Sequence, residues 1–408
     1  MSRDAPPPPQ VDFAVVGGGI LGLAVAREVL KRHAGATLAV LEAEDEIAAH
    51  QTSHSSGVIH AGVYYEPGSL RAKLCVEGAA ELTAYCDERS VPWSMNGKLI
   101  VATAEDEIDR LDRLEVRARE NGVAGLSRLS EDEITSVEPN ARGLSALHSP
   151  TTAVVEFGLV AAALADDIET AGGSIHLGAT VLDVKPSAAG LDLWTGKGGV
   201  RAGRAVFCGG LQSDRLARMA GGEVEPRIVP IRGGYLKVKA DRQDLVRGNL
   251  YPLPDPDLPF LGAHLTRTAD GSLLIGPTAM LAGARDAYRL TRLSRWDIWE
   301  TASWPGTWRL IARQPRAAVQ EIHHSVSARS LVKEARRLLP GLRLEDVEPG
   351  PAGVRAQALG RDGTLIEDFL TERTENAIHV RNAPSPAATS SLALARLVVD
   401  ELEAESPV

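Results

Sequence analysis

A residue spacing that could do chemistry lies near the start of the 408-residue chain. Gly17, Gly19 and Gly22 satisfy the pattern G-x-G-x-x-G, and Ile20 and Leu21 fill its last two free positions. Such glycines let a backbone turn tightly and approach a pyrophosphate, and the helix that follows offers its free N–H groups to the phosphates. These residues predict a dinucleotide-binding turn.

The residues around the turn predict the elements that must position it. An apolar run at 11–16 is typical of a buried parallel strand, helical spacing follows Gly22, and a second apolar run at 38–41 ends at Glu42. Glu42 is then placed to accept hydrogen bonds from a ribose. Strand, turn, helix and strand form the start of a Rossmann-like unit, which by itself leaves FAD and NAD open.

A hydroxyl-rich loop at 51–57 favours FAD. Its candidate cofactor residues are Thr52, Ser53, Ser55, Ser56 and Gly57. Ser and Gly also favour ordinary surface turns, but small side chains here would let the loop lie over the pyrophosphate and the flavin ring. Since NAD enzymes usually have no such loop at this place, we predict FAD as the cofactor.

Several longer stretches carry a resemblance to a known family. They are GVIHAGVYY from Gly57, GVRAQA from Gly353, RNAPSPAATSS from Arg381, and the segment from Tyr251 to His264. With them the chain resembles the L-2-hydroxyglutarate oxidase/dehydrogenase family of FAD enzymes, within the D-amino-acid-oxidase-like class, over nearly its whole length. Two positions depart from the family pattern: glycine at 234 replaces an acidic residue, and threonine at 278 replaces an asparagine.

The resemblance implies further cofactor contacts. The backbone at Val181 would hydrogen-bond the adenine, and Gly209 and Gly353 would let the chain pass close to the dinucleotide. A turn precedes a helix expected at 390–403, whose N-terminal N–H groups would face the flavin pyrimidine oxygen. The residues of that turn are Pro386, Ala387, Ala388 and Thr389.

Oxidation of a hydroxy acid needs a base for the hydroxyl proton and a cation for the carboxylate. Histidine suits the first role because its pKa lies near neutrality. We expect His264 to be the base and His60 to contact flavin or substrate, an order that the sequence leaves open. Arginine suits carboxylate through its planar fork. The expected substrate contacts are Arg232, Arg355, Tyr64 and Tyr251.

The predicted reaction is FAD-dependent oxidation of a 2-hydroxy acid to the 2-oxo acid, with L-2-hydroxyglutarate as the expected substrate. One alternative is a flavin amine or amino-acid oxidase that acts on a C–N bond, including one in a specialised biosynthetic pathway. Another is a flavin- or NAD-binding regulatory protein without turnover. The electron acceptor (oxygen, a quinone or a carrier protein) and covalent flavin attachment through His54 or His60 stay open.

The predicted fold class is α/β, with a Rossmann-like FAD-binding domain and a substrate domain built on a mixed or antiparallel sheet. Residues 1–10, which hold four consecutive prolines, are expected to be a disordered leader. The FAD-binding domain is assigned residues 11–95, 150–224 and 342–408, and the substrate domain residues 96–149 and 225–341.

Composition excludes several classes of protein. Forty-four basic and fifty-four acidic residues argue against a nucleic-acid binder, whose affinity rests on clustered positive charge. No run reaches the ~18 apolar residues of a membrane span, so any membrane contact is expected to be peripheral and at the inner face. The sparse cysteines favour a reducing, cytoplasmic location. Three cysteines without C-x-x-C spacing, and His323-His324 without suitably spaced partners, predict neither disulfides nor a metal site.

Overall fold

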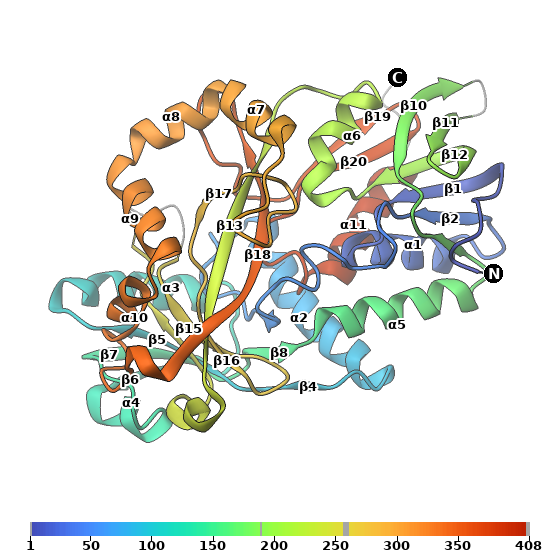
Figure 1. Cartoon of the computed structure of the whole chain (residues 1–408). Coiled ribbons are helices and arrows are strands. Elements are labelled where there is room, and N and C mark those ends of the chain that lie inside the picture. Colours follow the sequence, from blue (N-terminus) through green and yellow to red (C-terminus); the bar gives the residue numbers. More distant parts are fainter. Residues whose placement is uncertain (1, 188–189, 256–260, 405–408) are drawn as a thin grey trace.

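Three β-sheets organise the chain in the computed structural model, which describes residues 2–187, 190–255 and 261–404 (Figure 1). Within those residues the sheets have eight, nine and three strands. The two larger sheets lie in different halves of the molecule. Long strands β13 (Arg227–Val238) and β18 (Val347–Leu359) run between the halves.

The first sheet is Rossmann-like, as the sequence predicts. Its order is β10-β11-β12-β1-β2-β9, with β20 paired to β12 and β19 to β20. The β1 strand is parallel to both β12 and β2, and β2 is parallel to β9. The strands are β1 (Gln10–Val16), β2 (Leu38–Leu41), β9 (Ser174–His176), β10 (Val181–Ser187), β11 (Gly190–Thr195), β12 (Gly198–Phe207), β19 (Leu370–Thr374) and β20 (Ala377–Asn382).

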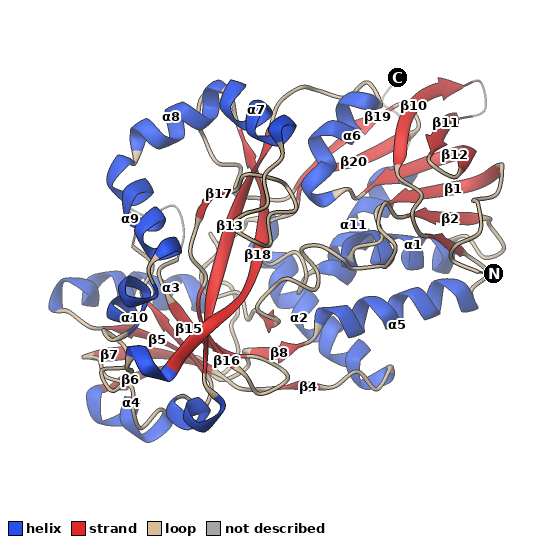
Figure 2. Cartoon of the chain, in the orientation of Figure 1, coloured by secondary structure: helices blue, strands red, loops and turns tan. Residues whose placement is uncertain are grey.

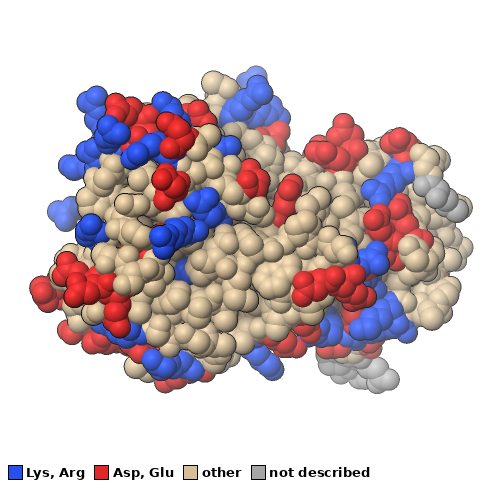
Figure 3. Space-filling view, turned by 90° about the horizontal axis from the view of Figure 1, so that it is seen from below, with Lys and Arg blue, Asp and Glu red and all other residues tan. Residues whose placement is uncertain are grey.

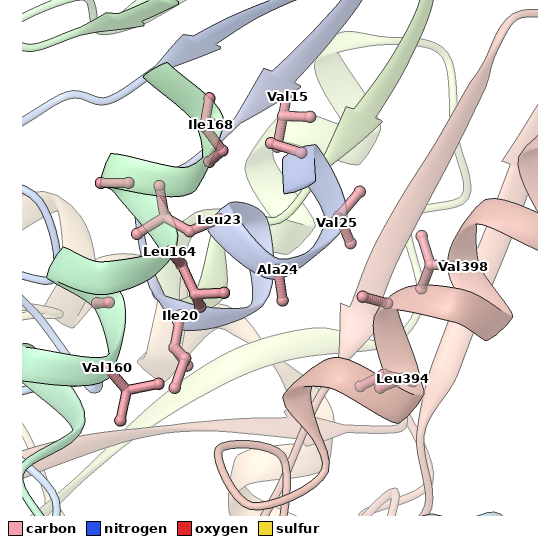
Figure 4. Close-up of a cluster of buried hydrophobic side chains, with 14 of the residues drawn as sticks. Val15, Ile20, Leu23, Ala24, Val25, Val160, Leu164, Ile168, Leu394 and Val398 are labelled. Atoms are coloured by element: carbon pink, nitrogen blue, oxygen red, sulfur yellow. The ribbon is translucent and has the colours of Figure 1, made fainter. Parts of the chain in front are cut away.

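Three helices cover one face of this sheet: α1 (Ile20–Arg32), α5 (Phe157–Thr170) and α11 (Ser391–Glu403) (Figure 2). The α1 helix lies between the other two and is buried on both sides, which explains its almost wholly apolar first three turns. Leu23 of α1, Leu164 of α5 and Leu394 of α11 are each at most 1% exposed in one continuous core (Figure 4). This packing fixes the N-terminus of α1 against the end of β1.

The second sheet is mixed, which confirms the predicted kind of sheet. Its order is β17-β13-β16-β15-β14-β5-β7-β6, with β18 paired to β13; β14 and β5 are parallel, and the other pairs are antiparallel. Its shorter strands are β5 (Lys98–Ala102), β6 (Ser127–Ser130), β7 (Ser145–Ser149), β14 (Asn249–Pro252), β15 (His264–Arg267), β16 (Leu273–Gly276) and β17 (Met280–Leu281). The small third sheet holds β3 (Val58–Ile59), β8 (Ala153–Val155) and β4 (Trp93–Ser94).

The remaining helices lie around the two large sheets. They are α2 (Leu70–Glu88), α3 (Ile108–Glu120), α4 (Glu131–Val137), α6 (Ser213–Met219), α7 (Arg295–Ser303), α8 (Pro305–Arg313), α9 (Pro315–Val326) and α10 (Ala328–Ala335). Helices α7 to α10 form an arc along the outer edge of the molecule (Figure 1). Within the described residues, none of the helices combines the length and apolarity needed to cross a bilayer.

Strand β18 corrects the predicted domain boundary at residue 342. It pairs antiparallel with β13 from Arg227↔Leu359 to Val238↔Val347, so it belongs to the second sheet. Its sequence contains two prolines and two glycines, which weaken any strand signal. Hydrogen bonds to the long strand β13 hold these residues in an extended strand that their own sequence does not predict.

The first residues also differ from the expected disordered leader. The Arg3 guanidinium makes two hydrogen bonds of 2.9 Å to the Glu169 carboxylate, and the Ala5 carbonyl accepts a 3.0 Å hydrogen bond from His176 Nδ1. Further along, the Pro9 carbonyl accepts from the Arg201 N–H. Proline stiffens this segment, and its carbonyls and one half-buried ion pair hold it along the edge of the first sheet.

Acidic and basic side chains are interspersed on the face drawn in Figure 3. They surround a broad central area without charged residues, and no continuous basic surface is visible on that face. The distribution agrees with the net charge of -10 in offering no footprint for a phosphate backbone there.

Candidate functional site

The glycine turn passes between two backbones. Gly17 has φ +112°, a conformation that favours glycine, and a Cβ at Gly17 would lie 2.4 Å from the Cys208 carbonyl oxygen. A Cβ at Gly22 would lie 2.0 Å from the Gly17 carbonyl oxygen. A larger residue at either position would push α1 away from the ends of β1 and β12, so both glycines are required for this close approach.

The N-terminus of α1 opens onto this turn. Its N-cap residue, Gly19, offers no side-chain cap, and the Ile20 N–H donates instead to Thr52 Oγ1 at 3.1 Å. The first turn carries no acidic residue, so the positive end of the helix dipole is not neutralised from within the helix. Leu21 packs beside the core that holds α1 in place. The arrangement suits a pyrophosphate.

Glu42 lies directly beside the turn. It follows β2, is 8% exposed, and accepts hydrogen bonds from the backbone N–H groups of Gly18 at 2.5 Å and Glu44 at 2.9 Å. A carboxylate held at the end of the second strand is the group that dinucleotide-binding folds use for ribose hydroxyls. Glu42 therefore lies beside the glycine turn, and its contact with ribose hydroxyls stays a prediction.

The hydroxyl-rich loop at 51–57 connects the two large sheets. The Gln51 carboxamide oxygen accepts the Ala356 N–H at 2.9 Å, and His54 Nδ1 donates to the Ala352 carbonyl at 3.1 Å; both partners lie in β18. A Cβ at Gly353 would lie 2.4 Å from the His54 carbonyl oxygen. The loop is thus clamped between the α1 N-terminus and the centre of β18.

Its predicted residues differ in exposure. Thr52 is buried, Ser56 and Gly57 are half-buried, and Ser53 and Ser55 are exposed. The Ser55 hydroxyl donates to the Thr52 carbonyl at 3.3 Å. Thr52 and Ser56 therefore have the closest access to the interior of the site.

A second helix N-terminus faces the same region. The predicted turn 386–389 immediately precedes α11, and Thr389 Oγ1, 1% exposed, accepts the His60 N–H at 3.1 Å. The buried hydroxyls of Ser390 and Ser391 have no hydrogen-bond partner among the residues that the structure describes. Because buried polar atoms are nearly always paired, these hydroxyls fit a bound group with polar atoms of its own, as a flavin has.

Two predicted cofactor residues lie at the edge of this cradle. Val181 opens β10, is 8% exposed and belongs to the apolar cluster on the other face of the first sheet. Gly209 follows β12, and a Cβ at this position would lie 2.3 Å from the Leu216 side chain. Their backbone contacts to a dinucleotide remain predictions.

A second group of side chains gathers where β5, β14 and β15 lie side by side. Lys98 opens β5, Tyr251 lies in β14, and His264 opens β15; the strand register puts all three on one face. The rings of Tyr251 and His264 lie 4.0 Å apart, and Lys98 Nζ lies 4.4 Å from the Tyr251 ring centroid. His264 Nδ1 donates to the Gly262 carbonyl at 2.9 Å.

His60 and Tyr64 complete this group from the segment after β3. His60 Nε2 lies 3.3 Å from the Ser385 hydroxyl, next to the turn before α11. Lys98 Nζ lies 5.3 Å from the centroid of the Tyr64 ring. The Tyr64 hydroxyl is buried without a hydrogen-bond partner in the described part of the chain. The segment thus joins the cofactor cradle to the second sheet.

Burial sets the protonation states of this group. It lowers the pKa of His264 to about 3 and the pKa of His60 well below its usual value, and the positive charge of Lys98 acts in the same direction on both. Burial also lowers the pKa of Lys98 to about 8, and it raises the pKa values of Tyr64 and Tyr251. At neutral pH the site therefore holds two neutral imidazoles, a lysine cation and two neutral phenols.

The structure separates the two predicted arginines. Arg355 pairs with Ile231 across the β13–β18 register, whereas Arg232 pairs with Val354, so the two guanidinium groups leave the ribbon on opposite faces. Arg355 lies on the side of His264, and its charge lowers the pKa of that imidazole further. Arg232 donates to the Tyr288 carbonyl at 3.3 Å instead. The prediction that both arginines line one substrate site conflicts with this register.

The two departures from the family pattern contact each other. The Gly234 N–H donates to Thr278 Oγ1 at 3.0 Å, and the Thr278 N–H donates to the Gly234 carbonyl at 3.0 Å. A Cβ at Gly234 would lie 2.8 Å from Arg232 Nη1. The missing side chain at position 234 therefore makes room for the Arg232 guanidinium.

Sequence reasoning missed Lys98 and Tyr235. Lys98 heads the apolar run KLIVA, and one charged residue at a strand end gives no local sign of burial. Tyr235 is half-buried near Arg355, with Ser56 as its hydrogen-bond partner. Tyr235 ends the sequence Arg-Gly-Gly-Tyr at 232–235, in which the arginine was the predicted substrate contact. The predicted segment 251–264 is described except at 256–260, so Pro259 and Phe260 lie outside the described residues.

The sequence predicts neither a metal site nor disulfides, and the described residues bear on both. They contain no group of three His, Cys, Asp or Glu side chains arranged to hold a metal ion. His324 Nε2 instead lies 3.0 Å from a Glu334 carboxylate oxygen, and Ser330 lies within hydrogen-bond distance of both His323 and His324. The three cysteines are free thiols.

Residues 12–401 match the protein family described as FAD dependent oxidoreductase. The chain is 44% identical to the mitochondrial L-2-hydroxyglutarate dehydrogenase of Nematostella vectensis, over 97% of this chain and 91% of that protein. It is 42% identical to the mitochondrial enzyme of that name from Homo sapiens (96% and 88% covered), and 40% identical to the L-2-hydroxyglutarate dehydrogenase of Indibacter alkaliphilus (96% and 98% covered).

Solved structures share the fold at much lower sequence identity. The dithionite-reduced L-alpha-glycerophosphate oxidase of Mycoplasma pneumoniae, with FAD bound, superposes with a TM-score of 0.80 at 20% identity, over 97% of this chain and 95% of that one. Glycine oxidase from Geobacillus kaustophilus gives a TM-score of 0.72 at 22% identity, with the same coverage. At this identity the likeness supports the fold alone.

Proposed function

The chain belongs to the FAD-dependent oxidoreductase family and, within it, to the L-2-hydroxyglutarate dehydrogenases, and from this membership we propose that it oxidises L-2-hydroxyglutarate to 2-oxoglutarate. FAD is the cofactor. The observation that carries the proposal is the 40–44% identity to these dehydrogenases over nearly the whole chain. The buried group of imidazoles, phenols and cations beside the cradle supports it.

FAD fits the cradle at each of its parts. The α1 N-terminus with Gly17, Gly22 and Thr52 would hold the pyrophosphate, and Glu42 the ribose hydroxyls. The α11 N-terminus, with the unpaired hydroxyls of Ser390 and Ser391, would hold the flavin pyrimidine. When bound, FAD supplies the acceptor for the hydride that leaves C2 of the substrate.

We assign the base role to His264. Because a carbonyl can only accept, the contact with the Gly262 carbonyl places the ring proton of His264 on Nδ1 and leaves a lone pair on Nε2. Burial keeps this imidazole unprotonated and also makes it a weaker base than an ordinary histidine, so the assignment rests on the free Nε2 and on the place of His264 beside Arg355. His60 lies against the turn before α11 and would contact the flavin or the substrate hydroxyl.

Arg355 and the two phenols would position the substrate. Arg355 lies on the His264 side of β18 and would bind the C1 carboxylate through its planar fork. The Tyr64 hydroxyl is a buried donor without a partner among the described residues, and the Tyr251 ring contacts the His264 ring at a tilt of 31°. Arg232 lies on the opposite face of the β13–β18 strand pair, so we do not expect it to touch the substrate.

The decisive experiment is anaerobic flavin reduction. Purified protein with bound FAD should lose its visible flavin absorbance on mixing with L-2-hydroxyglutarate, and 2-oxoglutarate should appear in equal amount. A panel of D-2-hydroxyglutarate, L-lactate, glycine and L-proline serves as control. Reduction by the amino acids with hydroxy acids inert would replace the proposal with an amine oxidase, and absence of flavin would end both.

The electron acceptor and the location follow as finer proposals. The relatives are named dehydrogenases, which favours a quinone over oxygen, and we place the chain in the cytoplasm at the inner face of a membrane. Trp296, Trp299 and Trp308 of α7 and α8 are 58–59% exposed, beside exposed arginines at 292 and 295. Faster quinone reduction with anionic vesicles present, and no hydrogen peroxide formation, is expected; the reverse pattern would contradict it.

A further inference from the structure

A buried lysine in the second sheet has no role in the proposed function so far. Lys98 opens β5 and is 2% exposed, and the four strand residues after it are equally buried. Its ammonium lies 4.4 Å from the Tyr251 ring centroid and 5.3 Å from the Tyr64 ring centroid. Its charge acts on both His60 and His264. Lys98 therefore belongs to the same group of side chains as the proposed base. We call this group of Lys98, His60, His264, Tyr64 and Tyr251, together with Arg355, the substrate chamber.

The described residues supply no counter-charge for this ammonium. Among the described residues, only the charge of a Cys75 thiolate would raise the pKa of Lys98, and burial holds that thiol protonated, so it supplies no anion. No carboxylate in residues 2–187, 190–255 and 261–404 raises the pKa of Lys98. A buried cation without an anion is costly to a fold. The ligand that enters the chamber is the natural source of that anion.

We infer that Lys98 binds the distal C5 carboxylate of the substrate and thereby selects a dicarboxylate. The inference rests on the proposed function. The chamber holds two cations, Lys98 and Arg355, and His264 lies within the electrostatic reach of both. A 2-hydroxy dicarboxylate offers two anionic groups on either side of its reacting carbon. With Arg355 on the C1 carboxylate, Lys98 is left for the second.

Tyr64 strengthens this assignment. Its hydroxyl is a buried donor without a partner in the described residues, and its ring is a neighbour of the Lys98 ammonium. A carboxylate has two oxygens, so one can take the ammonium and the other the phenol. A monocarboxylate of equal length would leave the ammonium unpaired and the Tyr64 donor unused, which is the penalty that produces selectivity.

Variants of Lys98 test the inference through the choice of substrate. With wild type, kcat/KM for L-2-hydroxyglutarate should exceed that for L-2-hydroxyvalerate, its monocarboxylate of equal chain length, by about a hundredfold or more, because the monocarboxylate leaves the buried ammonium unpaired. Lys98→Met should remove most of this ratio by raising KM for the dicarboxylate. Lys98→Arg should restore part of it, and Lys73→Met, at an exposed lysine of α2, should leave it unchanged. An unchanged ratio in Lys98→Met would overturn the inference.

Wild-type protein alone provides a second test, in case Lys98→Met does not fold. Calorimetric binding of glutarate to the FAD-loaded protein should weaken about tenfold for each pH unit above about 8, because Lys98 then loses its proton. Binding of butyrate should not follow this profile. The other groups facing Lys98 do not titrate there: the pKa values of His60 and His264 are lowered, those of Tyr64, Tyr251 and Cys75 are raised, and arginine stays charged.

The two proposals fail in different ways. If L-2-hydroxyglutarate does not reduce the flavin while glutarate binding keeps its pH profile, the reaction is wrong and the dicarboxylate site stands. If the flavin is reduced while glutarate and butyrate bind with the same pH profile, the assignment of Lys98 is wrong and the reaction stands.

Discussion

At the scale of single residues, the site is defined by side chains that burial holds in one protonation state. His264 and His60 are neutral because a desolvated imidazolium is unfavourable, while Lys98 and Arg355 supply positive charge beside them. A neutral base next to fixed cations suits a substrate that arrives as an anion and gives up a proton. The net charge of -10 therefore says little about this site, whose local sign is positive.

The first prediction at this scale concerns the base. His264→Gln should lower the rate constant of flavin reduction by L-2-hydroxyglutarate by about 10²–10⁴-fold, the usual contribution of general-base catalysis. Stopped-flow reduction measures it. The wild-type kcat/KM should also stay level between about pH 7 and 5, because a base with a pKa of about 3 remains unprotonated there.

His60→Gln is the matched control for this assignment. It removes an imidazole from the same group of side chains, half-buried where His264 is buried, so a general loss of stability or flavin would appear in both variants. We expect its effect to fall mainly on KM and on the flavin spectrum. A larger loss of reduction rate in His60→Gln than in His264→Gln would transfer the base role to His60.

At the scale of elements, the cofactor cradle is made by helix ends rather than by reactive side chains. The α1 and α11 helices pack side by side on one face of the first sheet (Figure 1). The N-terminus of α1 contacts Thr52, and the turn before α11 contacts His60. Thr52 and Thr389 thus link the loop at 51–57 and the segment after β3 to the two helix ends. Displacement of either helix would therefore disturb cofactor and substrate contacts together.

The prediction at this scale concerns the glycine turn. Gly22→Ala puts a Cβ 2.0 Å from the Gly17 carbonyl oxygen, so α1 must shift, and we expect the purified protein to lose most of its bound FAD. The ratio of flavin to protein absorbance measures this loss. Gly341→Ala is the control, since its Cβ meets nothing within 4 Å and its φ is not positive. Full FAD content in Gly22→Ala would contradict the role of this close approach.

At the scale of the whole molecule, a buried network of ion pairs joins helix α6, beside the first sheet, to helix α7 at the start of the outer arc. Arg285 bonds the carboxylate of Asp214 in α6 and that of Glu300 in α7 at 3.1 Å, and all three side chains are at most 7% exposed. Arg215 of α6 reaches Glu300 as well. The network holds the arc of α7 to α10 against the cofactor half, although the two lie far apart in sequence.

Removal of one partner from this network should be costly. Arg285→Met removes the two Arg285 hydrogen bonds of the buried Asp214 carboxylate, which among the described residues keeps only the Arg218 cation at 3.8 Å, while Glu300 keeps Arg215 and Arg218. We expect a loss of about 3–5 kcal/mol in the free energy of unfolding, because a buried carboxylate loses its nearest cation. Urea denaturation followed by circular dichroism measures it. Arg292→Met breaks an exposed pair with Asp286 and should cost under about 1 kcal/mol. Equal losses in both variants would mean that the network contributes no more than a surface pair.

The sequence by itself determined the cofactor half of this protein. The spacing of Gly17, Gly19 and Gly22, the acid at 42 and the helical periodicity are local properties, because a turn and an amphipathic helix are specified by residues a few positions apart. The helical spacing of Leu70, Leu74, Ala79 and Leu82 likewise predicts a helix at 70–88, and α2 begins and ends there. Family motifs located His60, His264, Tyr251 and Arg355 in the same way.

Only the tertiary structure decided which of these side chains meet. Whether Arg232 or Arg355 faces His264 depends on the register of β13 with β18, whose paired residues lie more than a hundred positions apart. Lys98 becomes a buried cation only because β14 and β7 flank β5, and the prolines in residues 2–9 are ordered by partners such as Glu169. Because a shift of one residue in a strand moves every side chain to the other face, long-range pairing rather than local sequence fixes the chemistry of the substrate chamber.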